Sequence, residues 1–471
     1  MMAVAYPSYR ASGTPWAARV PEHWRTARLR YVARVGNGTT PARDRFDYWS
    51  NGSVPWLASG QVNDYIVRKA REHITPVALK ESSLRLLPAG SVILGMVGQG
   101  KTRGMSAYLG IEATINQNLA GVTPGRELDG RYLHYTLIAA YDFLRNYGRG
   151  GNQAALNCAI VGSFTTLLPP RPEQDQIVAY LRAQDAHIAR FIKAKRDLIG
   201  LLTEQKLRII DHAVTRGLDA NIRLKPSGIE WLGEVPAHWE VQRLKNIADV
   251  VLGKMLTTEA KGDNGEFKPY LRSTNVQWLK PDVLDVKEMW IAHAEMPQLR
   301  IRKGDLLVSE GGEVGRACIW DEELAECYIQ NSVHRVAAKP VVLPEFLLHQ
   351  FFTYGKRGRF NAIVNRVSIA HLTREKLVTV PFALPPIEEQ QAICRWIAEA
   401  TQPLDEAIAR AEDEIKLIRE YRDRQIADVV TGQVDLRGWR PGPGDAVSDD
   451  DLAALGGDEP EEAETAESEE G

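Results

Sequence analysis

The chain has 471 residues, of which 44% are hydrophobic and 25% charged, and its formal net charge is −3. This length exceeds what one hydrophobic core organises and predicts two to four domains. We find neither an apolar run long enough to span a membrane nor a charged-then-apolar signal sequence in Met1–Val20, so we expect a cytoplasmic protein without membrane contact.

The four cysteines are scattered along the chain, and none forms a C-x-x-C pair. This spacing indicates neither a disulfide framework nor a metal site, and buried free thiols are expected. They are Cys158, Cys318, Cys327 and Cys394.

Charge is distributed unevenly along the chain. Residues 441–471 hold 12 Asp or Glu and no Lys or Arg, which leaves 58 basic and 49 acidic residues in 1–440, a net charge of +9. The basic body suits an anionic partner. The acidic end lacks the apolar content of a folded segment and is expected to be a disordered, solvated tail. The alternative is a self-shielding arm that competes with nucleic acid.

The sequence contains a long internal duplication with a period of about 215 residues. PEHWRTARLRYVARV from Pro21 matches PAHWEVQRLKNIADV from Pro236, and LLPPRPEQDQI from Leu167 matches ALPPIEEQQAI from Ala383. Such a period is far longer than a solenoid repeat, so each copy is a domain-sized module. Short apolar runs separated by Gly, Pro, Asn and Asp predict a mixed, strand-rich domain in each copy.

The stretch GMVGQGKT, from Gly95 to Thr102, satisfies the P-loop pattern and raises the possibility of an ATPase. A P-loop must open a helix, but Gly104 and Gly110 follow closely and weaken one. The matching stretch of the second copy, RKGDLLVSEGGEVGRACIWD, has lost the lysine and threonine. We therefore predict a β-hairpin with a glycine-rich turn, and a P-loop ATPase is the alternative.

A long helix is predicted at the end of each copy, over 173–216 and 388–432. Acidic residues follow each Pro-Pro, the apolar spacing becomes a four-three repeat, and Gly217 and Gly432 end the helices. Two such helices can pair with each other as a coiled coil. The expected seam is Ile188, Ile192, Lys195, Ile199, Leu202, Lys206, Ile209 and Ala213 in the first helix, and Leu404, Ile408, Ala411, Ile415, Ile418, Arg422, Gln425 and Val429 in the second.

These features predict an α+β protein with two homologous mixed domains separated by two long antiparallel coiled-coil helices and related by a pseudo-two-fold axis. The expected segments are a leader (1–20), a first domain (21–168), a central helix (169–217), a linker (218–235), a second domain (236–384), a C-terminal helix (385–432) and the acidic tail (433–471).

Each domain also contains polar, basic, glycine-containing stretches. LRNYGRGGNQAALN from Leu144 and YGKRGRFNAIVNRVS from Tyr354 occupy the same place in the two copies. Arg, Asn and Gln bind base edges and Lys and Arg bind phosphate, so these stretches and the glycine turns are candidate DNA contacts, with ordinary solvated loops as the alternative. The candidates are Gln99, Lys101, Arg103, Arg149, Asn152, Gln153, Arg316, Lys356, Arg357, Arg359, Asn361, Asn365 and Arg366.

From Pro21 to about Arg437 the chain resembles the specificity subunits of type I restriction-modification systems. The resemblance rests on PEHW and PAHW, on LPPRPEQ and LPPIEEQ, on the paired helices, and on TRGLD and TGQVD at their ends. It implies two target-recognition domains, each reading one half of a bipartite site in double-stranded DNA. The helices would form the spacer and dock two modification subunits.

The resemblance also implies that chemistry takes place on partner subunits. Modification subunits would bring S-adenosylmethionine, and restriction subunits would use ATP and Mg²⁺. The complex would be an adenine-N6 DNA methyltransferase and an ATP-dependent endonuclease. This chain itself would hold no catalytic residue, metal or cofactor. Because the two copies have diverged, the half-sites should differ, about one helical turn apart. A coiled-coil scaffold without DNA binding is the remaining alternative.

Overall fold

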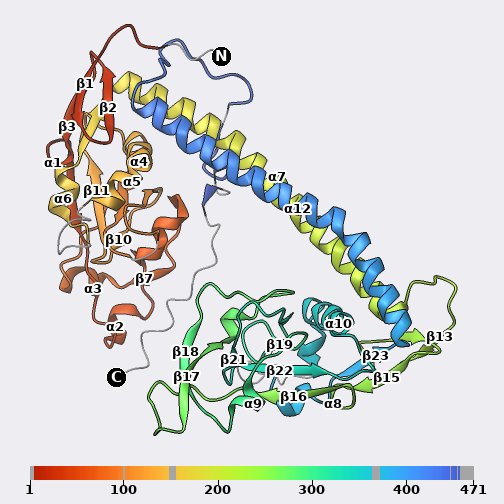
Figure 1. Cartoon of the computed structure of the whole chain (residues 1–471). Coiled ribbons are helices and arrows are strands. Elements are labelled where there is room, and N and C mark those ends of the chain that lie inside the picture. Colours follow the sequence, from red (N-terminus) through yellow and green to blue (C-terminus); the bar gives the residue numbers. More distant parts are fainter. Residues whose placement is uncertain are drawn as a thin grey trace. The chain divides into compact units, whose positions relative to one another are not determined.

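The computed structural model describes residues 5–98, 101–147, 155–362, 372–445, 447–452 and 455–456. The chain forms two compact units: unit 1 comprises Met1–Asp197 and Ala411–Gly471, and unit 2 comprises Leu198–Arg410. The two long helices, α7 (Arg171–Arg216) and α12 (Ile387–Val430), each contribute residues to both units (Figure 1).

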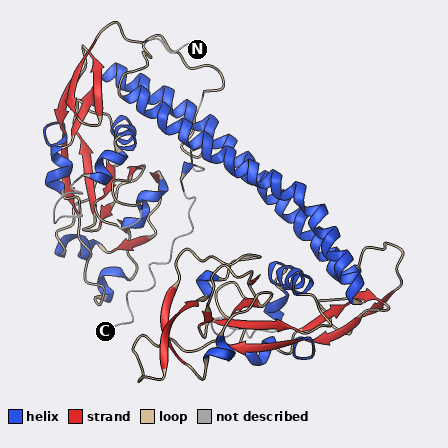
Figure 2. Ribbon diagram, in the orientation of Figure 1, coloured by secondary structure: helices blue, strands red, loops and turns tan. Residues whose placement is uncertain are grey.

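Unit 1 contains a five-stranded sheet, a three-stranded sheet and two two-stranded sheets (Figure 2). The five-stranded sheet has the order β4 (Ala33–Asn37), β11 (Leu119–Pro124), β8 (Val92–Gly95), β9 (Ser106–Leu109) and β6 (Ile66–Val67). The smaller sheets are β10 (Thr114–Ile115), β5 (Val54–Leu57) and β7 (Glu72–Ile74); β3 (Arg25–Arg28) and β12 (Thr165–Leu168); and β1 (Tyr9–Thr14) and β2 (Ala17–Pro21). The short helices are α1 (Leu29–Val32), α2 (Phe46–Trp49), α3 (Pro76–Glu81), α4 (Gly130–Ala139), α5 (Tyr141–Asn146) and α6 (Cys158–Ser163).

Unit 2 repeats this plan. Its four-stranded sheet has the order β16 (Ala248–Leu252), β22 (Val333–Ala338), β19 (Leu306–Ser309) and β20 (Ala317–Ile319). The smaller sheets are β18 (Lys287–Ala292), β17 (Gly265–Leu271) and β21 (Tyr328–Ile329); β15 (Glu240–Arg243) and β23 (Pro381–Leu384); and β13 (Leu224–Pro226) and β14 (Glu234–Pro236). Its short helices are α8 (Leu244–Ile247), α9 (Met296–Leu299), α10 (Pro344–Lys356) and α11 (Arg374–Leu377).

The sheets of the two units correspond one to one. In each three-stranded sheet the central strand pairs parallel with one neighbour and antiparallel with the other, as β5 does with β10 and β7, and as β17 does with β21 and β18. The strand that follows the start motif pairs antiparallel with the strand that precedes the long helix, β3 with β12 and β15 with β23. The duplication read from the sequence is thus a duplication of topology, and the predicted α+β fold class is confirmed.

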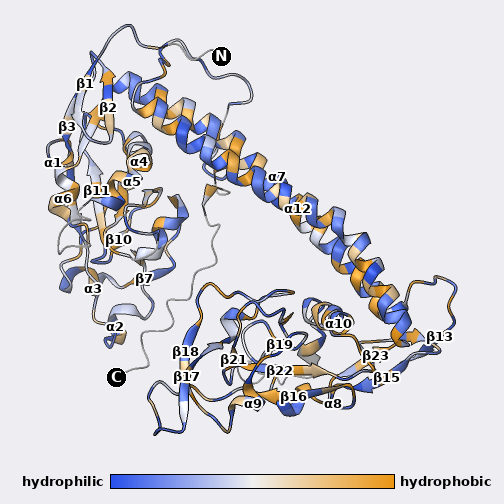
Figure 3. Ribbon diagram, viewed as in Figure 1, coloured by the Kyte–Doolittle hydropathy of each residue, from blue (hydrophilic) through white to orange (hydrophobic). Residues whose placement is uncertain are grey.

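The ends of the long helices belong to the cores of the two globular domains. In unit 1, Ile177 of α7 and Ile426 of α12 join the cluster around Trp24 and Tyr132. In unit 2, Ile210 of α7 and Ile393 of α12 join the cluster around Trp239 and Phe346. Apolar and polar stretches alternate along both helices (Figure 3). Each domain therefore cannot form its full core without residues from both helices.

Side-chain contacts show that the helices pair antiparallel. As the residue number rises along α7, the number of the partner on α12 falls: Tyr180 contacts Gln425, Asp185 contacts Arg422 and Lys195 contacts Glu414 in unit 1, and Lys206 contacts Asp405 in unit 2. Every expected seam position, from Ile188 to Ala213 and from Leu404 to Val429, is buried or half-buried.

Three expected segments differ from their sequence-based descriptions. The segments expected to be a leader and a linker contain the β1–β2 and β13–β14 pairs, whose residues Val20 and Val235 are fully buried in the unit cores. The described part of the acidic tail is not a solvated extension: Leu436, Trp439 and Leu452 are buried in unit 1. Composition alone predicted disorder because it carries no information about the surface against which these residues pack.

A buried ion pair joins the two helices to the first domain. The Arg422 guanidinium binds both carboxylate oxygens of Asp185 at 2.6 and 3.2 Å, and the hydroxyls of Tyr65 and Tyr135 donate to Asp185 Oδ2 at 2.6 and 2.8 Å. Burial, followed by the charge of Asp185, raises the pKa of Tyr65 above its usual value, so the hydroxyl stays protonated and donates.

Asp185→Asn should destabilise unit 1 strongly, because it leaves the buried Arg422 charge without compensation; we expect a loss of about 3 kcal/mol in the free energy of unfolding. The matched control is Glu414→Gln, which removes a half-exposed partner of Lys195 on the same helix pair and should cost less than about 1 kcal/mol. Urea denaturation of both variants measures the difference. Equal losses would show that the Asp185 pair is no more important than a surface one.

Candidate nucleic-acid interface

The start motif of each copy binds the first turn of a long helix. In unit 1, Trp24 Nε1 donates to Glu173 Oε2 at 2.6 Å, and His23 Nε2 lies 3.1 Å from both oxygens. In unit 2, Trp239 Nε1 donates to Glu389 Oε1 at 3.1 Å, and His238 Nε2 lies 2.7 Å from Oε2. We call this arrangement the His-Trp-Glu clamp. Because both tryptophans are fully buried, their N–H groups need an acceptor, and the glutamate supplies it.

The glutamine after each clamp glutamate completes the attachment. Gln174 Nε2 donates to the carbonyls of Glu127 and Pro169, both at 2.8 Å, while its Oε1 accepts from Asp129 N–H at 2.8 Å. Gln390 makes the same three bonds in unit 2, to Val341 O, Pro385 O and Leu343 N–H. The E-Q dipeptide therefore fixes the helix start to its own domain through the backbone.

The glycine that ends the other helix closes the clamp. Gly432, with φ +73°, follows α12 and lies so close to the start motif of unit 1 that a Cβ there would come within 2.3 Å of Pro21 Cδ. Gly217, with φ +76°, follows α7 and would place a Cβ 3.5 Å from the Trp239 ring in unit 2. Each start motif thus lies between the beginning of one helix and the end of the other. The motifs shared by both copies are structural.

The glycine-rich stretch GMVGQGKT follows β8, and the chain returns antiparallel as β9. Ile93 faces Ala107, and Gly95 N–H donates to Met105 O at 2.9 Å. The second copy has the same hairpin, with Leu307 of β19 opposite Cys318 of β20. In the described residues that directly follow Thr102 the chain forms a turn and then β9, not a helix, so the P-loop alternative is not supported.

In unit 1 this hairpin turn contacts the other polar stretch singled out from the sequence. Tyr141 Oη donates to Lys101 O at 2.8 Å, Arg103 donates to Arg145 O, and Leu156 N–H donates to Met96 O at 2.9 Å. The turn and both edges of the 144–157 stretch therefore form one surface at the end of α5.

Unit 2 brings the corresponding segments together through different side chains. Glu313 in the β19–β20 turn accepts from Lys356 Nζ and Trp278 Nε1, each at 2.7 Å, and Lys356 also lies 4.9 Å from the Trp278 ring centroid. Burial opposes ionisation of Glu313, but these two hydrogen bonds lower its pKa. The surface is in the same place as in unit 1, and its composition differs.

Several of the candidate DNA-contact residues form ion pairs or hydrogen bonds within the protein. Arg359 binds both oxygens of Asp211 on α7 at 2.6 and 3.2 Å, and Arg357 binds Glu204 on α7 at 3.1 Å. Arg316 Nη2 donates to Ser273 O at 2.8 Å. These arginines hold the segment after α10 and the hairpin turn in place. Their contact with DNA stays a prediction, as it does for Lys101, Arg103 and Lys356.

The remaining candidates lie where the structure gives no side-chain description. Gln99, Arg149, Asn152, Gln153, Asn365 and Arg366 are outside the described residues, and the side chain of Asn361 is not described.

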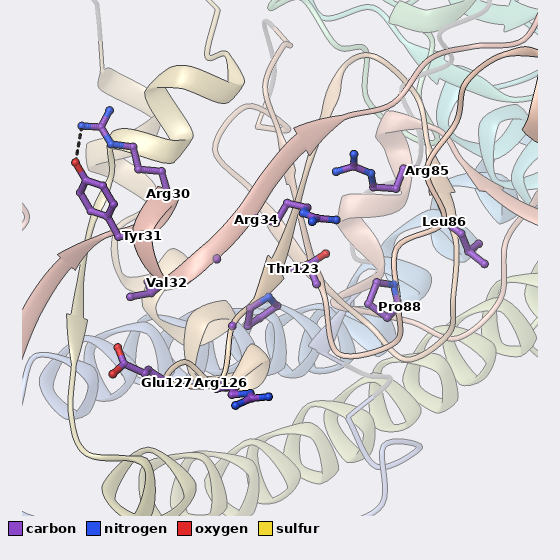
Figure 4. A pocket seen from close by; sticks show the side chains of 13 residues that line it. Arg30, Tyr31, Val32, Arg34, Arg85, Leu86, Pro88, Thr123, Arg126 and Glu127 are labelled. Carbon is purple, nitrogen blue, oxygen red and sulfur yellow. Dashed lines mark hydrogen bonds between the residues drawn. The ribbon is translucent and has the colours of Figure 1, made fainter.

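A second basic surface of unit 1 was not identified from the sequence. Arg30, Arg34, Arg85 and Arg126 line a shallow groove of about 770 Å³ beside the exposed ring of Tyr31 (Figure 4). Basic groups around an aromatic ring suit a nucleic-acid backbone with unstacked bases. Arg30 and Arg34 were visible in the start motif, but Arg85 and Arg126 come from distant segments that only the fold brings together.

The second copy changes part of this groove chemistry, although Lys245 keeps a basic residue at the position of Arg30. At the positions that match Tyr31 and Arg34, the duplicated start motif has Asn246 and Asp249. These two surface positions have diverged between the copies, while the clamp is kept.

Comparison with known proteins accounts for the duplication. The sequence profile described as type I restriction modification DNA specificity domain matches residues 21–199 and again 236–417. The chain belongs to this family of type I specificity subunits. The MjaVIII specificity subunit of Methanocaldococcus jannaschii is 22% identical over 429 residues, covering 89% of this chain and 95% of the relative. The EcoR124I/EcoR124II specificity subunit of Escherichia coli is 28% identical over 161 residues, covering 34% and 39%.

A solved structure supports the fold of this specificity subunit. A chain from a structure of the type I R-M system, concerned with complex assembly and conformational transition, aligns with a TM-score of 0.56 at 16% identity. The alignment covers 88% of this chain and 99% of the other. At this identity the likeness establishes the fold alone.

Among the described residues, none of the helices is long and apolar enough to cross a membrane. Within the same parts of the chain, no group of three or more His, Cys, Asp and Glu side chains is arranged to hold a metal ion.

Lys101→Ala should leave any nucleotide affinity of this specificity subunit unchanged, because Lys101 lies on a hairpin turn rather than ahead of a helix. Calorimetric titration with ATP, on the wild type and the variant, measures this. ATP binding that is present in the wild type and abolished by this substitution would restore the P-loop interpretation.

Proposed function

We propose that each recognition domain reads one half of an asymmetric, bipartite site in duplex DNA. The proposal rests on one observation: the two domains share their topology but differ in their surfaces. The same sheets and clamps recur in both, whereas Asp249 stands at the position of Arg34 and the hairpin-turn contacts differ. Identical surfaces would favour a palindrome, and diverged ones favour two different half-sites.

The long helices, in this proposal, set the spacing of the half-sites and provide docking surface for two modification subunits. Leu201, Leu417 and Tyr421 are apolar or aromatic residues on the outer faces of the helices, with exposed fractions of 70%, 63% and 55%. Exposed apolar residues on a helix pair that already has a buried seam are suited to further helix packing.

The chemistry is proposed to come from the partner subunits, in the cytoplasm. Modification subunits would supply S-adenosylmethionine, and restriction subunits would supply ATP and Mg²⁺. This division is consistent with a chain whose identified polar clusters are structural pairs and basic surfaces. A scaffold without DNA binding is disfavoured because the matched family is one of DNA specificity domains.

Exchanging residues 25–168 for those of a relative should change one half-site and leave the other half and the spacer unchanged. These bounds keep His23, Trp24 and Glu173, so the foreign domain retains the clamp. Methylome sequencing of a host expressing the chimaera with its modification subunits reports both half-sites at once. The reciprocal control exchanges 240–384. A swap of either domain that alters both halves would show that recognition is shared.

Lengthening both helices should lengthen the spacer. Four residues inserted after Gln205 in α7 and four after Asp405 in α12 keep Lys206 and Asp405 adjacent, and a coiled coil absorbs four residues as a stutter. The helices gain about 6 Å, which equals one or two base pairs of about 3.4 Å.

We therefore expect methylation of the same half-sites with the spacer longer by one or two base pairs. Insertion into α7 alone is the control and should reduce activity, because only one helix of the pair is lengthened. A fully active double-insertion variant with an unchanged spacer would refute the role of the helices in setting the distance.

A further inference from the structure

The acidic segment after α12 lies on a basic surface of unit 1. Asp449 binds Arg131 Nη2 at 2.9 Å and Arg182 Nη2 at 2.7 Å, and Asp450 binds Arg68. Asp445 lies 3.2 Å from His187 Nε2 on α7. The three arginines come from the segment after β6, from the first turn of α4 and from α7, so only the folded unit assembles them.

Apolar contacts hold this segment on both sides of its acidic residues. Trp439 is buried and packs edge-on against Tyr180, with ring centroids 5.4 Å apart. Leu452 is 2% exposed and joins Tyr65, Ile66 and Ala186 in a small separate cluster. Trp439 and Leu452 thus anchor a segment whose carboxylates lie between them, and we call residues 439–452 the acidic strap.

The arginines beneath the strap favour the charged form of Asp449. Burial alone would raise the pKa of Asp449, but the hydrogen bond from Arg131 and the charges of Arg131 and Arg182 lower it. Arg131 also lies over the ring of Tyr108, 4.3 Å from its centroid, which fixes the direction of the guanidinium. A preorganised set of guanidiniums binds phosphate as readily as carboxylate.

We propose that Arg68, Arg131 and Arg182 form a binding site for backbone phosphates of duplex DNA, and that the acidic strap occupies it as a built-in competitor. The proposal rests on the function proposed above, and it assigns DNA contact to residues outside the glycine turns. Duplex DNA is the occupant that fits for three reasons. The surface presents three guanidiniums, residues 1–440 have a net charge of +9, and the family is one of DNA specificity domains.

The acidic part of the strap can leave the surface while the Trp439 anchor remains. Leu452 packs in a small cluster with Tyr65, Ile66 and Ala186, apart from the main core of unit 1, and the ion pairs of Asp445, Asp449 and Asp450 are partly exposed. DNA that displaces the carboxylates leaves Trp439 in place, so the strap stays tethered beside the surface and can return. The consequence is weaker binding to non-specific duplex, because loosely held phosphates must compete with a tethered anion.

The test uses the full chain with Asp445→Asn, Asp449→Asn and Asp450→Asn combined. Binding of a fluorescent duplex of mixed sequence is measured by anisotropy over a range of salt concentrations. We expect about tenfold tighter binding at low salt and a steeper salt dependence, since three more phosphates become neutralised. The control removes the same charge further along the chain, by Glu461→Gln, Glu462→Gln and Glu464→Gln, and should have a smaller effect. Equal effects would mean that net charge alone matters and would overturn the proposal.

A second measurement links the strap to its surface. Arg182→Ala should change affinity little in the wild-type background, where the strap already occupies the site, and should reverse much of the gain in the triple variant. Arg126→Ala, in the separate groove of unit 1, should have the same effect in both backgrounds. If Arg182→Ala acted equally in both, the proposal would fail, and Arg68→Gln repeats the comparison should Arg182→Ala prove unstable.

The two proposals fail in different ways. Absence of site-specific methylation and of duplex binding in every variant would contradict the proposed function. DNA binding that is normal and independent of the strap would contradict only the competitor. A gain in affinity for a modification subunit, with DNA affinity unchanged, would assign the surface to protein docking and would likewise overturn this inference.

Discussion

The fold depends on a carboxylate that is held by a buried tryptophan. Glu173 and Glu389 lie in the first turns of the long helices, where a negative charge is favoured by the helix dipole, and each accepts a hydrogen bond from a fully buried indole. Without the glutamate the indole N–H would be buried without a partner, and without the indole the carboxylate would lose a hydrogen-bond donor. Helix and domain therefore stabilise each other at this point.

The clamp also explains why the long helices can be both spacer and core. Each start motif touches the first turn of one helix and the glycine that follows the other, so a domain folds only around two helix ends of opposite direction. Antiparallel pairing is thus imposed by the domains as well as by the seam. Contacts between helix and domain continue inward from the clamp, as those of Asp185 with Tyr65 and Tyr135 show.

Sequence reasoning recovered the features that repeat and missed those that depend on distant partners. Both helices and the hairpin after Leu94 follow from patterns within a few tens of residues, and the duplication follows from motifs that recur along the chain. The role of His23 and Trp24 did not, because their partner Glu173 lies 150 residues away. The same limit applies to the pairing of Arg359 with Asp211 on α7, which the local sequence does not indicate; the contact of Arg359 with DNA stays a prediction.

Divergence between the copies extends to the charges at the helix seam, and there it has a consequence for assembly. Lys206 of α7 and Arg422 of α12 are equivalent by the 216-residue shift, but Arg422 is buried with Asp185 and two tyrosines, whereas Lys206 reaches the half-exposed Asp405. At the position of Asp185 the second helix has Thr401. If the first domain docked on the second domain's helix ends, Tyr65 and Tyr135 would meet no carboxylate there. The buried pair thus makes the two docking positions distinguishable, which a chain made of two similar halves requires in order to fold in one way.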